Sequence, residues 1–403
     1  MMRRVLLALA LALALLGAGM EARAQPRLSI APDAPVETVF RWNSQRCNDL
    51  HVPDSPARAL RTGDGGIALW AAHLVNIPMR GWDFDSLAPA CEASSRGAEM
   101  SDPAAFQDRF WVQAVVPFMA EGRRQVLGLA SHEYMGWRHP GQCAAPFDGP
   151  GRRPAAFRCW YSAITAVVAD ERDLRFRAIP APQGIIAASP FPFDPSATQR
   201  SGFFSVSNAI VAEGKAMVMV YTEGVAGQPR GNCLLQAPLD ALPDGWRSLS
   251  GRGFTAAHPG PGSGPHTPCD VVGNAVFGGA PVRALVRFAV ADGSWWLAVF
   301  TRAAPRDRRD SASDGVFTSA SRDLREWTPA SRLWAMTPFR SQPEAGVYYE
   351  YPALIDHASS SAVFDTVAGA PRLHLYLTRL NLEDRRRGLD RDLVRVAVRV
   401  GGD

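Results

Sequence analysis

Short runs of β-branched, aromatic and other apolar residues recur along the whole chain beyond residue 24. Clusters of glycine, proline, aspartate and serine separate these runs, which is typical of strands joined by turns. No stretch beyond residue 24 keeps a 3.6-residue apolar period over three turns, so we expect an all-β protein. The runs include GIALWAAHL, FWVQAVVPFM, RQVLGLASHEY, YSAITAVVA, MVMVYTEG, RALVRFAV, SWWLAVFTR, GVFTSAS, LHLYLTRL and LVRVAVRV.

Three of the strand segments share a further pattern, in which a strand leads into a polar turn with adjacent Asp and Leu and then reaches an aromatic residue. These aromatics are Phe176, Trp246 and Trp327, at intervals of 70 and 81 residues. The 379 residues beyond position 24 would hold about five such units, and β-propellers have four to eight four-stranded blades. We therefore predict one five-bladed β-propeller domain of four-stranded antiparallel blades at residues 47–403, after an N-terminal lead-in at residues 25–46.

The alternative to a repeat is a chance recurrence of strand, turn and aromatic residue in a β-sandwich. A sandwich rarely needs 379 residues, and no Pro- or Ser-rich linker divides the chain into two domains. The propeller is therefore favoured.

The N-terminus has the composition of an export signal. The basic start MMRR precedes the apolar run VLLALALALALLGAG, and Ala22-Arg23-Ala24 follows as a cleavage site. We expect residues 1–24 to be removed and the protein to be secreted or periplasmic; the alternative is an uncleaved anchor. No later apolar run reaches the roughly 18 residues of a membrane span, so we expect no membrane contact after cleavage.

The charge balance argues against a nucleic-acid partner. The chain has 43 Lys+Arg and 39 Asp+Glu, and loss of residues 1–24 leaves 40 and 38. Lys215 is the only lysine, and the arginines alternate with acidic residues, as in LEDRRRGLDRD. Such interleaving indicates solvated or ion-paired surfaces, so we expect a monomer that binds no nucleic acid.

The six cysteines are an even number in a chain expected in an oxidising compartment, which predicts disulfides. Six cysteines allow 15 pairings, and we favour pairing of sequence neighbours. The sequence has no C-x-x-C motif, and His139 lies in an ordinary Pro-Gly loop, so we expect no metal. Phosphate-loop and dinucleotide motifs are missing as well, so we expect no cofactor. The favoured pairs are Cys47–Cys91, Cys143–Cys159 and Cys233–Cys269.

The segment VPDSPARALR carries the first candidate catalytic residue. Asp54 stands between two prolines and four residues before Arg58. A carboxylate held beside a guanidinium stays ionised, as a general base or nucleophile must, although a turn-capping role explains Asp54 equally well. We expect His73 and Asn76 to close the following strand and donate to a hydroxylated ligand.

The segment LASHEYMGW carries the second candidate. Glu133 ends an apolar strand between His132 and Tyr134, where partial desolvation would raise its pKa, as a general acid requires. A structural salt bridge is the alternative role. Asp108, near the start of another strand, is a further candidate carboxylate.

Two other segments suit sugar recognition. Asn208 in VSNAIV can hydrogen-bond hydroxyl groups. VYYEYPALID places Tyr348, Tyr349 and Tyr351 around Glu350, and aromatic rings beside a carboxylate fit the apolar faces and hydroxyl edges of sugars.

These segments resemble secreted bacterial five-bladed propeller proteins related to glycoside hydrolase families 43 and 32, which include arabinanases, xylosidases and fructosidases. The resemblance runs from about Cys47 to Val400 and implies carboxylate chemistry on a glycosidic substrate. It is carried by VPDSPARALR, HEYMGWRHPGQC, CWYSAIT, VSNAIV, GNCLLQAPLDALPDGWRSLSG, TSASRDLREW, EYPALID, LYLTRL and RDLVRV.

In those families a first-blade aspartate is the base or nucleophile, a second-blade aspartate tunes pKa values, and a third-blade glutamate is the acid. Asp54 matches the first role, whereas the second blade would offer both Asp108 and Glu133 and the third only Glu223. The chain also has His132 where the relatives have asparagine.

We thus expect a secreted glycoside hydrolase acting in an axial pocket by a two-carboxylate mechanism. Asp54 is the expected base or nucleophile, Glu133 the acid, and Glu350 or Asp108 a modulator. The alternative is a propeller that binds carbohydrate or protein without cleavage. The expected substrate-binding residues are Arg58, His73, Asn76, His132, Asn208 and Tyr349.

Overall fold

The structure, a computed structural model, describes residues 25–144, 158–262, 266–290, 293–303, 314–338, 346–383 and 386–401. The predicted signal peptide, residues 1–24, lies outside this range. Strands dominate the described chain, and its helical segments are single turns, so the all-β prediction is confirmed. These turns are α2 (Trp42–Gln45), α3 (Asn274–Phe277), η1 (Pro103–Ala105), η2 (Gly136–Arg138) and η3 (Leu239–Ala241).

The first sheet is antiparallel and small, with its strands in sequence order. Its strands are β3 (Arg58–Arg61), β4 (Ile67–Trp70), β6 (Met79–Gly81) and β7 (Ala88–Pro89). A separate pair is formed by β5 (Val75–Asn76) and β8 (Ser95–Arg96). His73 and Asn76 were expected to close the same strand as Trp70, but β4 ends at Trp70 and His73 lies in the following loop.

The next two groups of strands are joined into one larger sheet. In both groups, successive long strands pair antiparallel, and β11 and β14 pair parallel where the groups meet. The first group comprises β9 (Phe110–Ala120), β10 (Arg123–Met135), β11 (Trp160–Asp170), β12 (Arg177–Ala178) and β13 (Ile185–Ala188). The second comprises β14 (Ser201–Val206), β15 (Ile210–Ala212), β16 (Lys215–Thr222), β17 (Gly231–Pro238), β18 (Arg247–Ser250), β19 (Gly253–Ala256), β20 (His258–Pro259) and β21 (Val271–Val272).

The fourth group is again antiparallel in sequence order, with β27 (Thr366–Val367) added parallel to its first strand. Its strands are β22 (Val282–Val290), β23 (Gly293–Arg302), β24 (Gly315–Ser321) and β25 (Ser331–Trp334).

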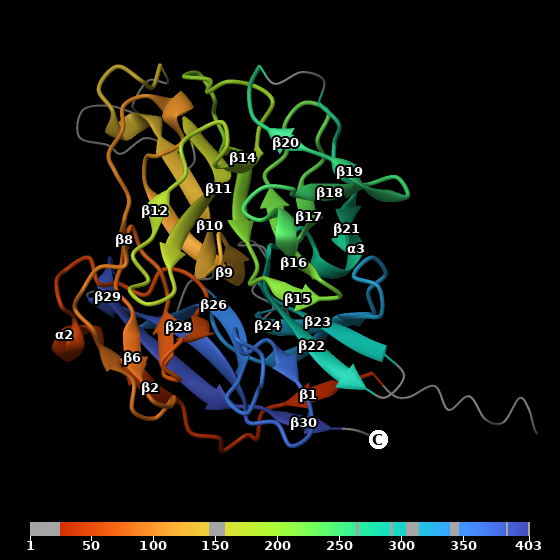
Figure 1. The fold of residues 1–403 in the computed structure, drawn as a ribbon. Helices are drawn as coiled ribbons and strands as arrows, with labels where there is room; N and C mark the ends of the chain where they lie inside the picture. Colours follow the sequence, from red (N-terminus) through yellow and green to blue (C-terminus); the bar gives the residue numbers. More distant parts are fainter. Residues whose placement is uncertain are drawn as a thin grey trace, which may run out of the picture.

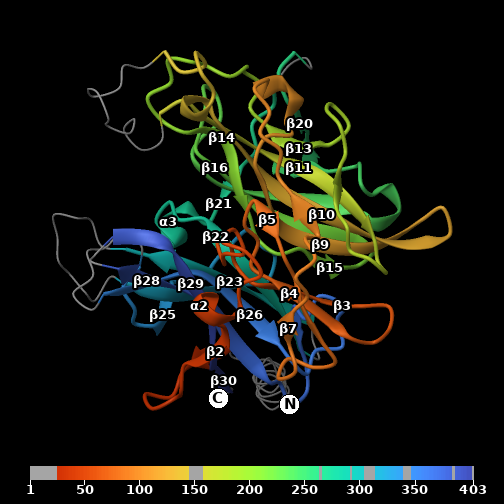
Figure 2. The ribbon, with the colours of Figure 1, turned by 90° about the vertical axis from the view of Figure 1, so that its left-hand side faces the viewer.

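The last sheet joins the two ends of the described chain (Figure 1). Near the N-terminus, β2 pairs antiparallel with β29, and β1 pairs with β30, so the segment expected to be a lead-in supplies two strands. Figure 2 shows β2 and α2 beside β29. The strands are β1 (Arg27–Ser29), β2 (Glu37–Phe40), β26 (Val347–Asp356), β28 (Leu373–Glu383), β29 (Arg386–Ala397) and β30 (Arg399–Gly401).

Apolar clusters pack each of these strand groups against the next. Leu60 and Val112 share one cluster, which joins the first group to the second. Three further clusters join the second to the third, the third to the fourth, and the fourth to the last. A fifth, with Ile355 and Leu69, packs the last group against the first. Each group therefore packs against the next, and the last packs against the first.

The repeated turns predicted from the sequence lie at equivalent places. They follow β11, β17 and β24, each the third long strand of its group, and lead to the outer strand. Leu174 and Leu324 in two of the turns adopt left-handed backbone angles, with φ of 54° and 63°, and are buried. The aromatics Phe176 and Trp246 are buried as well, so the repeat reflects a packing requirement of the turn.

All three predicted disulfides are confirmed. Their Cα–Cα distances are 5.2 Å for Cys47–Cys91, 5.8 Å for Cys143–Cys159 and 5.8 Å for Cys233–Cys269. Among the residues that the structure describes, no helix has the length and apolar character needed to cross a membrane.

Candidate functional site

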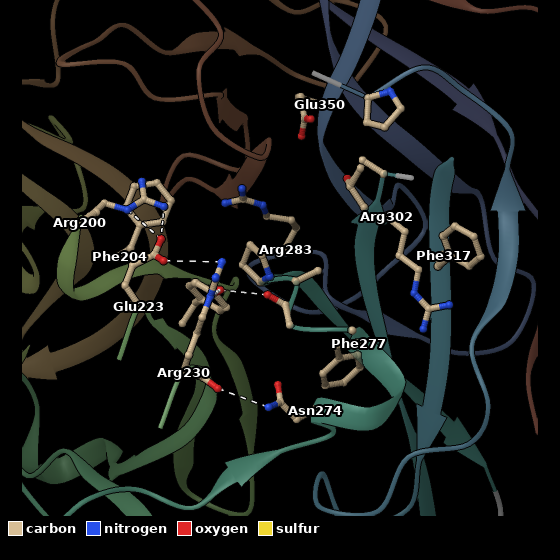
Figure 3. Close-up of a pocket in the computed structure, with 18 residues that line it drawn as sticks. Arg200, Phe204, Glu223, Arg230, Asn274, Phe277, Arg283, Arg302, Phe317 and Glu350 are labelled. Carbon is tan, nitrogen blue, oxygen red and sulfur yellow. Dashed lines mark hydrogen bonds and ion pairs between the residues drawn. The ribbon is translucent and has the colours of Figure 1, made fainter. Parts of the chain in front are cut away.

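Charged side chains from every strand group gather where the groups meet. A pocket of about 730 Å3 opens there, lined by strands of the third, fourth and last groups. Figure 3 shows Glu350 at one side of it, the ion-paired Glu223 and Arg200 at the other, and the Arg283 side chain between them. Asp54 and Glu133 are not part of this lining. The charges of the lining residues Arg200 and Arg283 act on Glu133, and Asp54 accepts from Tyr351, the neighbour of the lining residue Glu350.

Asp54 lies in the loop before β3 and is held by partners from the last sheet. Its Oδ1 accepts a hydrogen bond from the phenol of Tyr351 at 3.2 Å and one from the guanidinium of Arg391. Its backbone N–H donates to the carbonyl of Ala71 at 3.4 Å. Only 18% of the Asp54 side chain is exposed, so its orientation is fixed by these contacts rather than by water.

His73 extends the cluster around Asp54. Its Nε2 lies 3.7 Å from Oδ2 of Asp54, and its ring meets that of Trp111 edge to face. Burial lowers the pKa of His73, and Asp54 opposes this effect. A neutral imidazole beside Asp54 can donate to, or accept from, a ligand hydroxyl.

Glu133 lies near the end of β10, and 6% of it is exposed. Burial raises its pKa to about 8; the charge of Asp54 raises it further, while those of Arg200, Arg109 and Arg283 oppose the shift. Within the described part of the chain its carboxyl group forms no hydrogen bond or ion pair. Glu133 is therefore protonated at neutral pH and is electrostatically coupled to Asp54.

A glycine brings the third group close to Glu133. Ser162 of β11 pairs with Glu133 on one side and with Gly202 of β14 on the other. Gly202 has a φ of 90°, and a Cβ there would lie 2.1 Å from the Ser162 carbonyl oxygen. Only glycine permits this approach, which places the nearby Arg200 where its charge acts on Glu133.

Arg200 and Glu223 form the wall of the pocket next to Glu133. The Nε of Arg200 donates to Oε1 of Glu223 at 2.8 Å, and its guanidinium lies 3.2 Å from the centroid of the Phe204 ring. Arg230 faces the other carboxylate oxygen of Glu223 at 3.7 Å. Both carboxylate oxygens of Glu223 therefore face an arginine.

Arg283 of β22 connects the pocket to the Asp54 cluster. Its Nη1 donates to Ser205 Oγ at 2.8 Å, and its guanidinium lies 5.4 Å from the centroid of the Tyr351 ring. Tyr351 in turn donates to Asp54. Arg283 therefore links the lining of the pocket to the Tyr351–Asp54 pair.

Asp108 and His132 lie apart from this cluster. Asp108 is fully buried, accepts from the Met100 N–H at 3.0 Å, and lies 3.1 Å from Nε2 of His139. His132 is also fully buried, and burial lowers its pKa to about 3. As neighbours on a strand, Glu133 and His132 point to opposite faces of the sheet.

Four other residues expected to bind substrate bond or pack elsewhere. The buried guanidinium of Arg58 donates to backbone carbonyls, including that of Arg283 at 2.9 Å. Asn76 donates to Ser94 Oγ at 2.7 Å, and Asn208 exchanges hydrogen bonds with the backbone of Leu285. The Tyr349 ring packs on Trp334 at 5.1 Å. These side chains stabilise the strands around the site.

The partners of Asp54 and the arginine wall were not among the expected site residues. Tyr351 was noted only as one of a row of tyrosines, and Glu223 only as a strand-end carboxylate. Arg200 directly precedes a strand, and Arg391 lies within LDRDLVRV, but arginine is so frequent in this sequence that neither stood out. A search for arginines at strand ends facing a central carboxylate would have included Arg200.

No family model and no curated protein matches the sequence. Solved structures do match, among them an α-L-arabinanase from Cellvibrio cellulosa complexed with arabinohexaose. It is 12% identical with a TM-score of 0.43, over 88% of this chain and 96% of the other. An α-L-arabinofuranosidase from Podospora anserina in complex with cellotriose is 8% identical with a TM-score of 0.43, over 90% and 95%. A glycosyl hydrolase from Bacteroides ovatus is 10% identical with a TM-score of 0.46, over 94% and 96%.

These matches are glycoside hydrolases, the class that the sequence itself resembles. At such identities and TM-scores, the activity of this chain has to be inferred from its own site.

Proposed function

We propose that the protein is a secreted glycoside hydrolase built as a five-bladed β-propeller, with Asp54 and Glu133 as its catalytic pair. The observation that carries this proposal is the contrast between the two carboxyl groups. Glu133 is buried with its pKa raised to about 8, whereas Asp54 accepts hydrogen bonds from a guanidinium and a phenol. Pairs of carboxyl groups in opposed environments are suited to acid and base roles.

The proposed reaction uses the proton that Glu133 keeps at neutral pH. Glu133 donates this proton to the glycosidic oxygen as the bond to the anomeric carbon breaks. Asp54 either removes a proton from the attacking water or attacks the anomeric carbon itself. Arg391 and Tyr351 keep its carboxylate oriented, and Glu350 is the further carboxylate at the pocket.

The packing of the strand groups supports the propeller. The successive strands of each group pair antiparallel, each group packs against the next through an apolar cluster, and the cluster with Ile355 and Leu69 joins the last to the first. The strand from the opposite chain end, β2, pairs with β29 and covers its edge, as expected where the two chain ends complete one blade of a propeller. The three disulfides agree with export into an oxidising compartment.

Hydrolysis tests the proposal directly. Wild type, Asp54→Asn and Glu133→Gln would be assayed on nitrophenyl pentosides and on oligosaccharides by product analysis. We expect cleavage by wild type and a loss of at least about 100-fold in kcat for each variant. The control is Glu121→Gln, whose side chain is 81% exposed.

Activity unchanged in Asp54→Asn would overturn the assigned role. If wild type binds members of the oligosaccharide panel but cleaves none, the protein is a carbohydrate-binding propeller instead. Retained folding of each variant would be checked by its thermal midpoint.

A further inference from the structure

The pocket beside Asp54 and Glu133 is unusually rich in arginine. Four guanidinium groups line it, against two carboxylates among the described residues. Its volume of about 730 Å3 lies within the roughly 300–1,000 Å3 of small-molecule sites. The arginines are Arg200, Arg230, Arg283 and Arg302, and the carboxylates are Glu223 and Glu350.

The pairing of these charges is uneven. Glu223 accepts from Arg200 and faces Arg230, so one carboxylate serves two arginines. Arg283 and Arg302, in contrast, form no ion pair with a carboxylate in the part of the chain that is described. The Arg283 guanidinium donates a hydrogen bond to the Ser205 hydroxyl, and that of Arg302 donates one to the Val276 carbonyl.

Both of these arginines contact aromatic rings. Arg283 stands over Tyr351, and Arg302 stands over Phe317 at 4.9 Å and Phe300 at 5.3 Å. Both guanidinium groups are half-buried, and each retains N–H groups beyond those already bonded. Figure 3 shows the Arg283 side chain extending into the pocket between Glu350 and Glu223.

A buried cation behind the pocket adds to this positive charge. Among the residues that the structure describes, Arg58 donates only to the carbonyls of Ala57, Gln113 and Arg283. Its pKa falls to about 9 because of burial and the charge of Arg283, so it stays protonated at neutral pH. Since Glu133 is neutral at that pH, three described carboxylates at the site face six guanidinium groups, so positive charge is in excess. The carboxylates are Asp54, Glu223 and Glu350, and the guanidinium groups are those of Arg58, Arg200, Arg230, Arg283, Arg302 and Arg391.

We infer that the substrate is an acidic saccharide whose anionic substituent binds Arg283, with Arg302 available to a second anionic group. This inference rests on the proposed function, because it names the substrate class of the same site. An anion at Arg283 would sit beside Tyr351, which bonds Asp54. A guanidinium group can donate two parallel hydrogen bonds to a carboxylate or a sulfate, and the aromatic rings suit the apolar face of the sugar.

The test measures binding without turnover, in Glu133→Gln protein. The probes are oligogalacturonates and glucuronate-bearing xylo-oligosaccharides, each beside its carboxyl-reduced counterpart, and sulfated oligosaccharides of the same backbones. Calorimetry in 50 mM NaCl should give the acidic form an advantage of about tenfold or more over the neutral form. The advantage should shrink in 500 mM NaCl because salt screens the charges.

Arginine variants in the same background identify the group responsible. Arg283→Gln should reduce the acidic advantage to less than about threefold while neutral probes keep their affinity; Arg283→Lys should retain part of it. Arg302→Gln provides a second readout if Arg283→Gln does not fold. Arg123→Gln, whose side chain is 67% exposed, is the matched control and should change nothing.

The tighter of the carboxylated and sulfated probes identifies the anionic group. Equal affinity for acidic and neutral forms, binding of no acidic probe, or an advantage that survives both pocket substitutions would each overturn the inference. An acidic preference without hydrolysis by wild type would leave this inference intact and remove the catalytic proposal instead.

Discussion

Tyr351 donates a hydrogen bond to Oδ1 of Asp54 at 3.2 Å from a backbone with a φ of 58°. The register of β26 against β28 shifts between Glu350 and Ala353 at this point. In a regular strand, Glu350 and Tyr351 would point to opposite faces. The bulge instead lets Glu350 line the pocket while Tyr351 reaches Asp54.

Removing the Tyr351 hydroxyl should weaken catalysis more than folding. Tyr351→Phe keeps the ring under Arg283 but deletes one of the two donors on Asp54. We expect kcat to fall by about tenfold with KM nearly unchanged, and the free energy of unfolding to change by about 1 kcal/mol. Steady-state kinetics and urea unfolding measure both, and an unchanged kcat would rule out an orienting role for the phenol.

Arg391 and Asp54 should be energetically coupled. Their side chains are only 16% and 18% exposed, so removing one leaves the other poorly compensated. We expect Arg391→Gln to destabilise the protein by about 2 kcal/mol. In a double-mutant cycle with Asp54→Asn, the combined loss should be smaller than the sum by about 1 kcal/mol or more. Additive losses in urea unfolding would mean that the pair contributes nothing.

The raised pKa of Glu133 sets the alkaline limit of the proposed activity. Because its pKa is about 8, the general acid loses its proton as the pH rises through that value. We expect kcat to fall on the alkaline side of about pH 8, measured in buffers from pH 5 to 10. A rate independent of pH over that range would contradict the assignment of Glu133 as acid.

The same shift in pKa affects stability. The pKa of Glu133 is near 4.5 in the unfolded chain and about 8 in the folded protein. Its stabilising contribution to the free energy of unfolding is therefore full below pH 4.5 and is lost as the pH rises through about 8. Each pKa unit corresponds to about 1.4 kcal/mol. Urea unfolding at pH 5 and pH 8.5 should show a smaller difference for Glu133→Gln than for wild type, whereas Glu121→Gln should behave as wild type does.

His132 should affect acid stability and not ligand binding. Burial lowers the pKa of His132 from 6.5 to about 3. Its stabilising contribution to the free energy of unfolding is therefore present above pH 6.5 and is lost as the pH falls toward 3. His132→Leu should therefore unfold at lower pH than wild type, as followed by circular dichroism. Its affinity for oligosaccharides should equal that of wild type, and a marked loss of affinity would instead indicate a role in the site.

The Cys233–Cys269 disulfide should be a major source of stability. It joins residues 36 apart in sequence, and both half-cystines are buried. Replacing both with alanine should lower the free energy of unfolding by roughly 3–4 kcal/mol in urea, because the unfolded chain gains freedom. A loss below about 1 kcal/mol would show that the unfolded chain remains compact without the cross-link.

The features that the sequence could predict are those encoded locally. The composition of runs such as VLGLA in β10 predicts strands. The disulfides were predicted by pairing cysteines that are neighbours in the sequence. Asp54 and Glu133 were recognisable as carboxylates at strand ends. In each case the signal lies within a few residues of the feature itself.

The direction of a side chain and its distant partners were not predictable in this way. Arg58 lies four residues from Asp54, yet it donates to backbone carbonyls, whereas Arg391 lies 337 residues away and pairs with Asp54. Asn76 and Asn208 have the polar character of ligand-binding residues, but their amides bond to neighbouring segments. An asparagine that binds a ligand and one that bonds to a neighbouring segment look the same in the sequence. Only the packing of one strand group on another decides which role the side chain has.

The pairing of β2 with β29 has a consequence for biogenesis. Phe40 is paired with Leu393, so the sheet that carries Tyr351 and Arg391 receives its outer strand from the other end of the chain. Contacts between residues so far apart in sequence form slowly, because a very long loop must close first. During synthesis, β2 would lack this partner until β29 followed, and the Asp54 cluster, which includes Arg391 of β29, would be assembled only at that last step.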